Sequence, residues 1–128
     1  MSIRRVVPNL HIGQFDENRA FYVDFLGFEQ IMDLGWIATF AAPGTPSAQI
    51  SLIGADATAP LLADVSIEVD DVDAYHAKAV TWGAEVVYGP VNEPWGVRRF
   101  FVRDPNGKVL NIVGHAEVPS RSGPRSSR

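Results

Sequence analysis

"WGVRRFFVRDPNGKVLNIV", residues 95–113, predicts two β-strands joined by a tight turn, because Asp104-Pro105-Asn106-Gly107 is rich in turn-forming residues. The second strand alternates Val, Leu, Ile and Val around a single amide, Asn111. A polar residue inside an apolar strand indicates that one face of the strand meets something polar. The hairpin therefore raises the question of what Asn111 faces.

The hairpin closes the second of two similar halves of the chain. In chain order, the predicted elements are a strand at 3–12, a helix at 17–26, strands at 28–34, 36–42 and 48–53, then a strand at 63–70, a helix at 72–82, and strands at 85–89, 97–103 and 108–113. Asp16 and Asp71 are the predicted N-caps of the helices, and Gly27 and Gly83 end them. Pro8 suggests that the first strand lies at an edge or in an interrupted ladder.

The two halves also align weakly in sequence. Residues 25–29 (FLGFE) match 81–85 (TWGAE), and 50–54 (ISLIG) match 110–114 (LNIVG). Two copies of one small unit indicate a pseudo-twofold repeat, and such a unit cannot bury its sheet alone. We therefore expect an α+β fold, in which two βαβββ modules form one curved mixed sheet around a cup with the helices on its outer face.

The 128 residues fit a single domain, which we expect at 1–116, with modules at 3–54 and 63–115, followed by a flexible basic tail at 117–128. The net charge is −4, and leaving out the three tail arginines makes it −7. A negative body repels phosphates, so we expect no nucleic-acid partner. Without cysteine, a signal-like N-terminus or an apolar run of about 20 residues, the sequence predicts a cytoplasmic protein with no membrane segment.

Strand alternation places small or acidic polar side chains on the face of the sheet opposite the helices. They are Asn9, His11, Gln49, Ser51, Asp64, Ser66, Glu68 and Asn111. A half-solvated antiparallel sheet is one explanation, although long Lys and Arg side chains usually coat such a face. If the sheet curves, this face lines a cup with a few polar groups among apolar walls, which is the usual form of a small-molecule site.

The run AFYVDFLGFE (residues 20–29), followed by the hairpin at 95–113, resembles the vicinal oxygen chelate superfamily over about residues 3–115. That superfamily includes glyoxalase I, extradiol dioxygenases, fosfomycin-resistance enzymes and bleomycin-resistance proteins. The resemblance implies the paired βαβββ fold, but fold alone does not fix an activity.

Metal-dependent members of the superfamily take His or Glu ligands from four strand positions, which the resemblance assigns here to Val7, Ser51, Asp64 and Asn111. Only Asp64 is a good ligand for a transition metal. If the first strand were aligned differently, His11 would replace Val7 at its metal position, and the four positions would still hold too few good metal ligands. The resemblance therefore points to the metal-free bleomycin-resistance-like branch, with no cofactor and with a homodimer as the usual assembly.

Three functions stay open from the sequence. The leading expectation is metal-independent binding of a small molecule, such as an antibiotic or a metabolite, in the cup or in a dimer crevice. The alternative is a glyoxalase-like lyase or isomerase, or a dioxygenase-type enzyme, with a non-standard metal or acid–base site. The third is a purely structural domain whose own side chains fill the cup.

The candidate ligand-binding residues combine the polar face with nearby aromatic and charged side chains. They are His11, Trp36, Phe40, Ser51, Asp64, Glu68, Trp95, Arg98, Phe100 and Asn111. The aromatic residues are either plugs or stacking walls for a planar ligand. Arg98 either pairs with an acid of this chain or binds an anionic group. In one interpretation His11 is a structural histidine and Glu68 is a surface acid at the rim of the cup. In the other they form an acid–base pair, since they occupy corresponding positions in the two halves.

Overall fold

A computed structural model describes residues 1–116, so the expected tail at 117–128 lies outside the described residues. The first module contains β1 (Ile3–His11), α1 (Phe15–Ala20), the π-helical turn η1 (Phe21–Phe25), β2 (Glu29–Asp33), β3 (Ile37–Ala42) and β4 (Thr45–Ile53). The second contains β5 (Val65–Val69), α2 (Val72–Trp82), β6 (Val86–Asn92), β7 (Val97–Arg103) and β8 (Val109–His115). Both halves have the predicted order of strand, helix and three strands.

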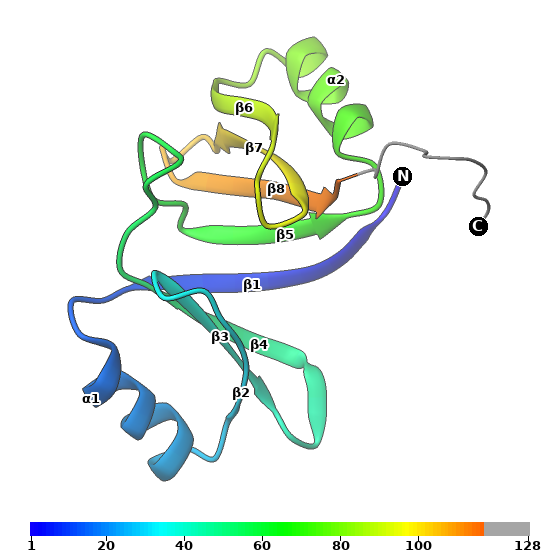
Figure 1. Ribbon diagram of the computed structural model, residues 1–128. Helices are drawn as coiled ribbons and strands as arrows, with labels where there is room; N and C mark the ends of the chain where they lie inside the picture. The colour runs from blue at the N-terminus through cyan, green and yellow to red at the C-terminus, as the bar shows by residue number, and fades with distance from the viewer. Residues whose placement is uncertain (117–128) are drawn as a thin grey trace, which may run out of the picture.

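The strands form one curved, open sheet in the order β2-β3-β4-β1-β5-β8-β7-β6. The two modules meet where β1 pairs antiparallel with β5, and within each module the first and last strands pair in parallel. Figure 1 shows α1 and α2 at opposite ends of this sheet. The predicted α+β fold with two βαβββ modules around one curved mixed sheet is confirmed.

Of the two alternatives for Pro8, the edge is wrong and the interrupted ladder is confirmed. β1 lies at the centre of the sheet, but its ladder with β4 covers only residues 9–11, so the missing N–H of Pro8 falls before that ladder begins. The N-cap prediction is wrong: Asp16 is not the N-cap of α1. Gln14 holds that position without a side-chain cap, and Asp16 lies in the first turn, where the helix dipole favours a carboxylate. Asp71 caps α2 as predicted, accepting from the Ala74 N–H at 3.0 Å.

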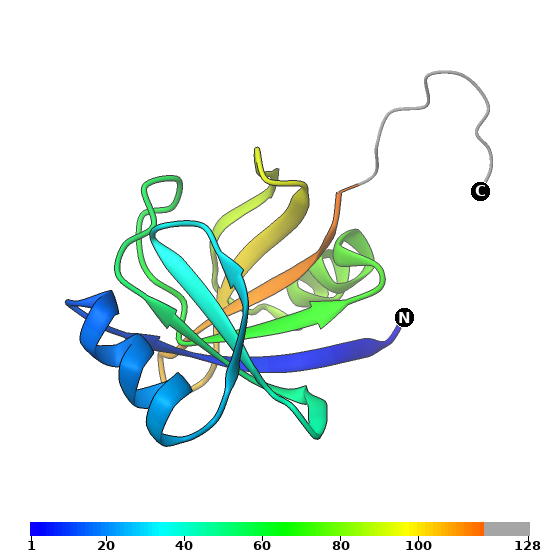
Figure 2. The ribbon, with the colours of Figure 1, turned by 60° about the horizontal axis from the view of Figure 1, so that its bottom comes forward.

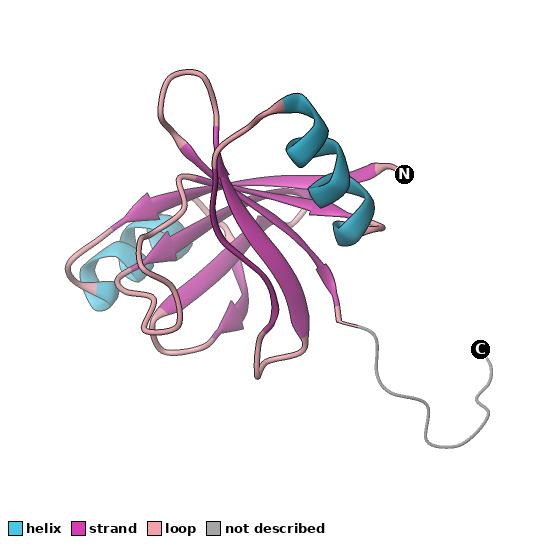
Figure 3. Cartoon of the chain, turned by 90° about the horizontal axis from the view of Figure 1, so that it is seen from above, coloured by secondary structure: helices cyan, strands magenta, loops and turns pink. Residues whose placement is uncertain are grey.

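The core is divided among three clusters, one under each helix and one inside the curve of the sheet. Phe40 and Leu52 lie in the cluster that α1 and η1 cover, and Phe100 and Ile112 lie in the cluster beneath α2. The third cluster surrounds Phe101 on the opposite face and includes side chains of the segment that connects β4 to β5. Figures 2 and 3 show the twist that gives the sheet an inner and an outer side. Among residues 1–116, no helix is long and apolar enough to cross a membrane.

Candidate functional site

Three polar side chains meet on the inner face of the sheet, where the two modules join. Ser66 of β5 is paired with Asn111 of β8 and with Val7 of β1, so Asn9, two residues farther along β1, points to the same side. The Asn9 and Asn111 amide nitrogens each donate to the Ser66 hydroxyl oxygen at 3.0 Å. We call Asn9, Ser66 and Asn111 the floor cluster. Asn111 therefore faces Ser66 of its own module, which also binds Asn9 of the other module.

Two acceptor atoms of the floor cluster have no hydrogen-bond partner among the described residues. Asn9 and Asn111 are 7% and 8% exposed, and Oδ1 of each is buried without a hydrogen-bond partner among the described residues. Asn9 Nδ2 has a second acceptor, the Ala63 carbonyl at 3.3 Å, so its donor side is fully used. Because a buried carbonyl oxygen without a partner costs about 1–3 kcal/mol, two of them side by side require an explanation.

A second polar pair lies on the same face, and both of its members are satisfied. The hydroxyls of Thr39 on β3 and Ser51 on β4 are 2.7 Å apart, and both residues are buried. Thr39 and Ser51 face each other across the antiparallel β3–β4 ladder. Ser51 was expected on the inner face; Thr39, its partner, was not expected there.

The acidic candidates and His11 bind other parts of the chain. Asp64 Oδ2 accepts from the Val109 N–H at 2.8 Å, and Glu68 is 2.8 Å from the Arg5 guanidinium. His11 Nε2 is 3.2 Å from the Ala63 carbonyl oxygen. Glu68 is paired with Arg5, so His11 is six strand residues farther on, about 20 Å away. The two cannot act as the acid–base pair that their repeat positions suggested.

Two tryptophans from different modules touch across the sheet. The rings of Trp36, just before β3, and Trp95, in the β6–β7 loop, have centroids 5.2 Å apart in an edge-to-face arrangement. The sequence left both residues open as plugs or as stacking walls of the cup, and the structure brings them into contact. Their contact joins the outer strands of the two modules and gives the inner face an aromatic border.

A buried cluster of charges, missed by the sequence analysis, lies beside Trp95. Arg99 of β7 donates to Glu93 Oε2 at 2.7 Å and to Asp56 Oδ2 at 2.9 Å, and all three side chains are at most 5% exposed. The guanidinium also donates to the Thr58 hydroxyl at 2.9 Å. We call Arg99, Asp56 and Glu93 the Arg99 cluster. It ties the β4–β5 segment and the β6–β7 loop to the inner face of β7.

Aromatic rings complete the surroundings of Arg99. Its guanidinium carbon lies 4.8–5.5 Å from the ring centroids of Tyr88, Trp95 and Phe101. The Tyr88 hydroxyl donates to Glu93 Oε2 at 2.8 Å. Desolvation, together with this hydrogen bond to Glu93, raises the pKa of the Tyr88 phenol above its ordinary value of 10.0. The cation is thus paired and enclosed by the chain itself.

Three of the candidate residues lie on the wrong face of the sheet to line the cup. Phe40 and Phe100 are buried beneath the helices, and Arg98 bonds Asp73 of α2 at 2.9 Å. The reason is the two-residue period of a strand: Asn111 is paired with Phe101, so the inner-facing residues of β7 are Arg99 and Phe101. The register set by the Asp104–Gly107 turn was the signal that could have corrected this.

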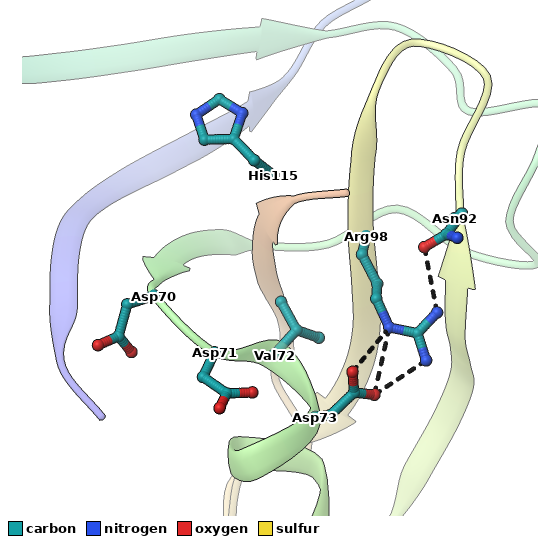
Figure 4. A pocket seen from close by; sticks show the side chains of 7 residues that line it. All are labelled: Asp70, Asp71, Val72, Asp73, Asn92, Arg98 and His115. Atoms are coloured by element: carbon teal, nitrogen blue, oxygen red, sulfur yellow. Dashed lines mark hydrogen bonds and ion pairs between the residues drawn. The ribbon is translucent and has the colours of Figure 1, made fainter. Parts of the chain in front are cut away.

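Arg98 and Asp73 instead border an open, polar pocket of about 560 Å³ beside the N-terminus of α2 (Figure 4). The Arg98 guanidinium also donates to Asn92 Oδ1 at 3.1 Å. Its hydrogen bonds lower the pKa of the Asp73 carboxyl. On the far side of the pocket, the Ser2 N–H donates to Asp70 and lowers the pKa of that carboxyl as well. The charges of Arg98, Asp73 and Asp70 are thus paired within the chain, and His115 also lines the pocket.

The residues at the superfamily's metal positions do not fit a metal of that type. Val7 offers no donor atom, Ser51 is bonded to Thr39, and one Asp64 oxygen is used by a backbone N–H. Asn111 presents an amide oxygen, which suits hard cations such as Ca²⁺ better than zinc or iron. Within residues 1–116, no three His, Asp or Glu side chains gather closely enough to hold a metal ion.

The fold and this inner face together define a class of proteins: paired βαβββ modules with a site inside the curve of the shared sheet. The model of the Glyoxalase/Bleomycin resistance protein/Dioxygenase superfamily matches residues 4–112, and the chain belongs to this superfamily. No curated protein matches the sequence significantly. The family assignment confirms the superfamily resemblance; it does not separate the metal-free branch from the others.

Solved structures agree with this assignment at the level of the fold. A hypothetical protein from Bacillus halodurans C-125 is 15% identical with a TM-score of 0.72, over 94% of this chain and all of its own. A superfamily member from Vibrio splendidus 12B01 is 20% identical with a TM-score of 0.62, over 88% of this chain and 99% of its own. The Mn(II)-bound glyoxalase from Novosphingobium aromaticivorans is 24% identical with a TM-score of 0.60, over 93% of this chain and 42% of its own.

Proposed function

We propose that this protein binds a small molecule on the inner face of its sheet, without a metal ion, and that the floor cluster recognises a hydrogen-bond donor of that molecule. The single observation that carries the proposal is the pair of buried amide oxygens, Asn9 Oδ1 and Asn111 Oδ1, without partners among the described residues. A ligand N–H or O–H group would supply what both oxygens lack. Buried polar groups that were fully paired would give no support to a ligand, whereas these two unpaired oxygens support one.

The surroundings narrow the chemistry of the ligand. Asn9 Nδ2 uses both of its hydrogens within the chain and Asn111 Nδ2 uses one on Ser66, so the two cluster atoms that have no partner at all among the described residues are acceptors. Such a floor favours an amide, amino or guanidinium group over a carboxylate or phosphate. Trp36 and Trp95 add aromatic surface on which a planar group can stack. Sequestration of an antibiotic or a metabolite, as in the bleomycin-resistance-like branch, fits these features.

Metal independence is supported by the donor set at the superfamily's metal positions. A non-ligating valine, two neutral oxygens that suit hard cations and one engaged carboxylate do not make a site for zinc, iron or manganese. Metal analysis of the purified protein tests this part directly. A stoichiometric transition metal that is lost in an Asp64→Ala variant would overturn it.

The binding site can be tested with a panel of planar amines, amidines and amides, including aromatic cationic antibiotics, in a thermal-shift screen. For each compound that raises the melting temperature, the affinity is then measured for Asn111→Leu and Asn111→Asp. Leu removes the acceptor and is expected to weaken binding at least about tenfold, as loss of a buried hydrogen bond to a charged donor does. Asp keeps an acceptor at the same place and retains or strengthens binding.

Two results would contradict the proposal. One is a panel in which carboxylates and phosphates raise the melting temperature and donor-bearing compounds do not. The other is a ligand whose affinity is the same for the wild type, Asn111→Leu and Asn111→Asp. As a matched control, Thr39→Val alters a buried polar residue of the same face that is already paired, and it is expected to leave the affinity unchanged.

Homodimerisation by docking of whole chains is part of the proposal. Both modules of one chain supply the floor cluster, so module exchange is not needed to complete it. On the outer face, neither helix covers β1 (Figure 1), and Val6 and Leu10 are 54% and 38% exposed. Phe25 of η1 is exposed as well. Exposed apolar surface of this kind is typical of an interface.

Analytical ultracentrifugation tests the dimer. Val6→Glu is expected to shift the mass to that of a monomer, because it buries a charge in the interface. Val80→Glu, which changes an exposed valine on α2, is the matched control and should leave the mass unchanged. A wild-type protein that sediments as a monomer at high micromolar concentration would show the dimer to be wrong, while leaving the binding site of each chain intact.

A further inference from the structure

A second candidate site lies on the outer side of the sheet, far from the cup. Between α2 and strands β7 and β8 there is an apolar groove of about 300 Å³. Phe100, Val102 and Ile112 of the sheet are buried at its base, and Tyr75 of α2 lines its side. Trp82, at the end of α2, borders the groove and is 83% exposed. We call this space the α2 groove.

The repeat explains why the groove exists. The alignment of residues 25–29 with 81–85 places Phe28 opposite Ala84, and extending it by two residues toward the N-terminus places Val23 opposite Ala79. In the first module, Val23 and Phe28 pack against the core beneath α1. In the second, both equivalents are alanines that line the groove. The missing side-chain volume is that of a phenyl ring and two methyl groups, so the second module lacks, between its helix and its sheet, side-chain volume that the first module has there.

Positive charge borders this apolar space, although the described part of the protein is acidic overall. Lys78 of α2 and Arg103 of β7 both line the groove. Lys78 is exposed, and the Arg103 guanidinium is 3.7 Å from Glu85, whose side chain is 69% exposed. An ion pair between exposed side chains at this distance contributes little and is easily exchanged for another anion. The groove therefore combines an apolar interior with two cations at its edge.

From these features, we infer that the α2 groove binds a small amphiphilic carboxylate, with its apolar tail against Phe100 and Ile112 and its head group beside Lys78 and Arg103. The exposed indole of Trp82 would cover the tail, which removes from water the largest exposed side chain of α2. This site is separate from the floor cluster: Phe100 and Ile112 point to the outer face, and Asn111 points to the inner face.

Octanoate, below its micelle concentration, is the probe for this site. Its binding to the full-length protein is measured by calorimetry, alongside butanoate, hexanoate and the uncharged analogue 1-octanol. Affinity is expected to rise about fourfold for each added methylene group until the groove is full. In amide NMR spectra, the shifted signals should lie in α2 and β7. An absence of octanoate binding at millimolar concentration would overturn the inference.

Filling the groove tests its position. Ala84→Phe, which restores the residue of the first module, is expected to weaken octanoate binding at least about tenfold, and Ala79→Leu is expected to do the same. Ala77→Leu changes an exposed alanine of the same helix and should have no effect. If a filling variant folds and its affinity for octanoate is unchanged, octanoate binds elsewhere and the inference is overturned. A change of oligomeric mass in that variant would also overturn it, because the groove would then be an interface between copies of the chain.

One variant at the surface of the groove and one in the cup complete the test. Lys78→Gln is expected to weaken octanoate binding about two- to fivefold and to leave 1-octanol binding unchanged, since only the carboxylate meets the ammonium group. An equal effect on both compounds, or none on either, would remove the basis for a carboxylate. Asn111→Leu should not affect octanoate. If it does, octanoate binds in the cup and the α2 groove is rejected, while the panel of donor-bearing compounds decides the cup function separately.

Discussion

The floor cluster and the Arg99 cluster lie on the same face of the same sheet, but they differ in how completely their polar atoms are paired. Arg99 has two carboxylates, a hydroxyl and three aromatic rings around it, all from this chain. The floor cluster has two buried oxygens without partners among the described residues. A cluster that is satisfied by its own chain stabilises that chain. A cluster that is left short is available for another molecule.

Arg99→Met tests the fully paired cluster of the two. It leaves Asp56 and Glu93 buried without their cation, so we expect the free energy of unfolding to fall by about 3–5 kcal/mol in urea denaturation. Arg98→Met is the neighbouring control: its partner Asp73 is largely exposed, and the expected loss is below about 1 kcal/mol. Equal losses for the two variants would mean that the Arg99 cluster does not stabilise the loops as described.

Thr39→Val tests a second fully paired group on the same face, the uncharged Thr39–Ser51 pair. The change leaves the buried Ser51 hydroxyl without the partner that it has at 2.7 Å, so we expect a loss of about 1–3 kcal/mol in the free energy of unfolding. The double variant Thr39→Val/Ser51→Ala removes both partners and should recover part of the loss. No recovery in the double variant would contradict a pairwise hydrogen bond.

Tyr88, beside Arg99, should make the free energy of unfolding depend on pH in alkaline solution. Its pKa is raised in the folded protein, so the unfolded chain loses the phenolic proton first. The contribution of Tyr88 to stability is therefore complete below about pH 10 and declines as the pH rises toward the folded-state pKa, by at most about 1.4 kcal/mol per pH unit. Denaturation of Tyr88→Phe, followed between pH 9 and 11, should show a shallower decline than the wild type. Parallel curves would contradict the desolvation of Tyr88.

Most of the fold could be predicted from short-range signals. The Asp104–Gly107 turn, the glycines that end the helices and the repeat between the halves are local features, and they gave the right elements in the right order. The position of β1 was the exception. Pro8 is a local signal for an edge, but β1 lies at the centre because the join between the modules is a tertiary contact, which no local pattern records.

The candidate site was predicted only in part, and the errors have two physical causes. The inner-facing residues of β5 and β8 followed from alternation, but Arg98 and Phe100 of β7 were chosen for their chemistry beside the loop, and the register with β8 places Arg99 and Phe101 on the inner face instead. Asp56 and Glu93 lie in irregular segments, where no period indicates a direction. The partners of a buried charge in such segments become visible only when the chain is folded.

If the floor cluster is a binding site, Asn111 is not needed for the chain's own stability. The direct test is the free energy of unfolding of Asn111→Leu, measured by urea denaturation beside Thr39→Val. Because Asn111 Oδ1 lacks a partner among the described residues and Ser66 keeps its hydrogen bond from Asn9, the account predicts a value within about 1 kcal/mol of the wild type. A loss of more than about 2 kcal/mol would contradict it, because Asn111 would then be a structural residue and the cup would need no ligand.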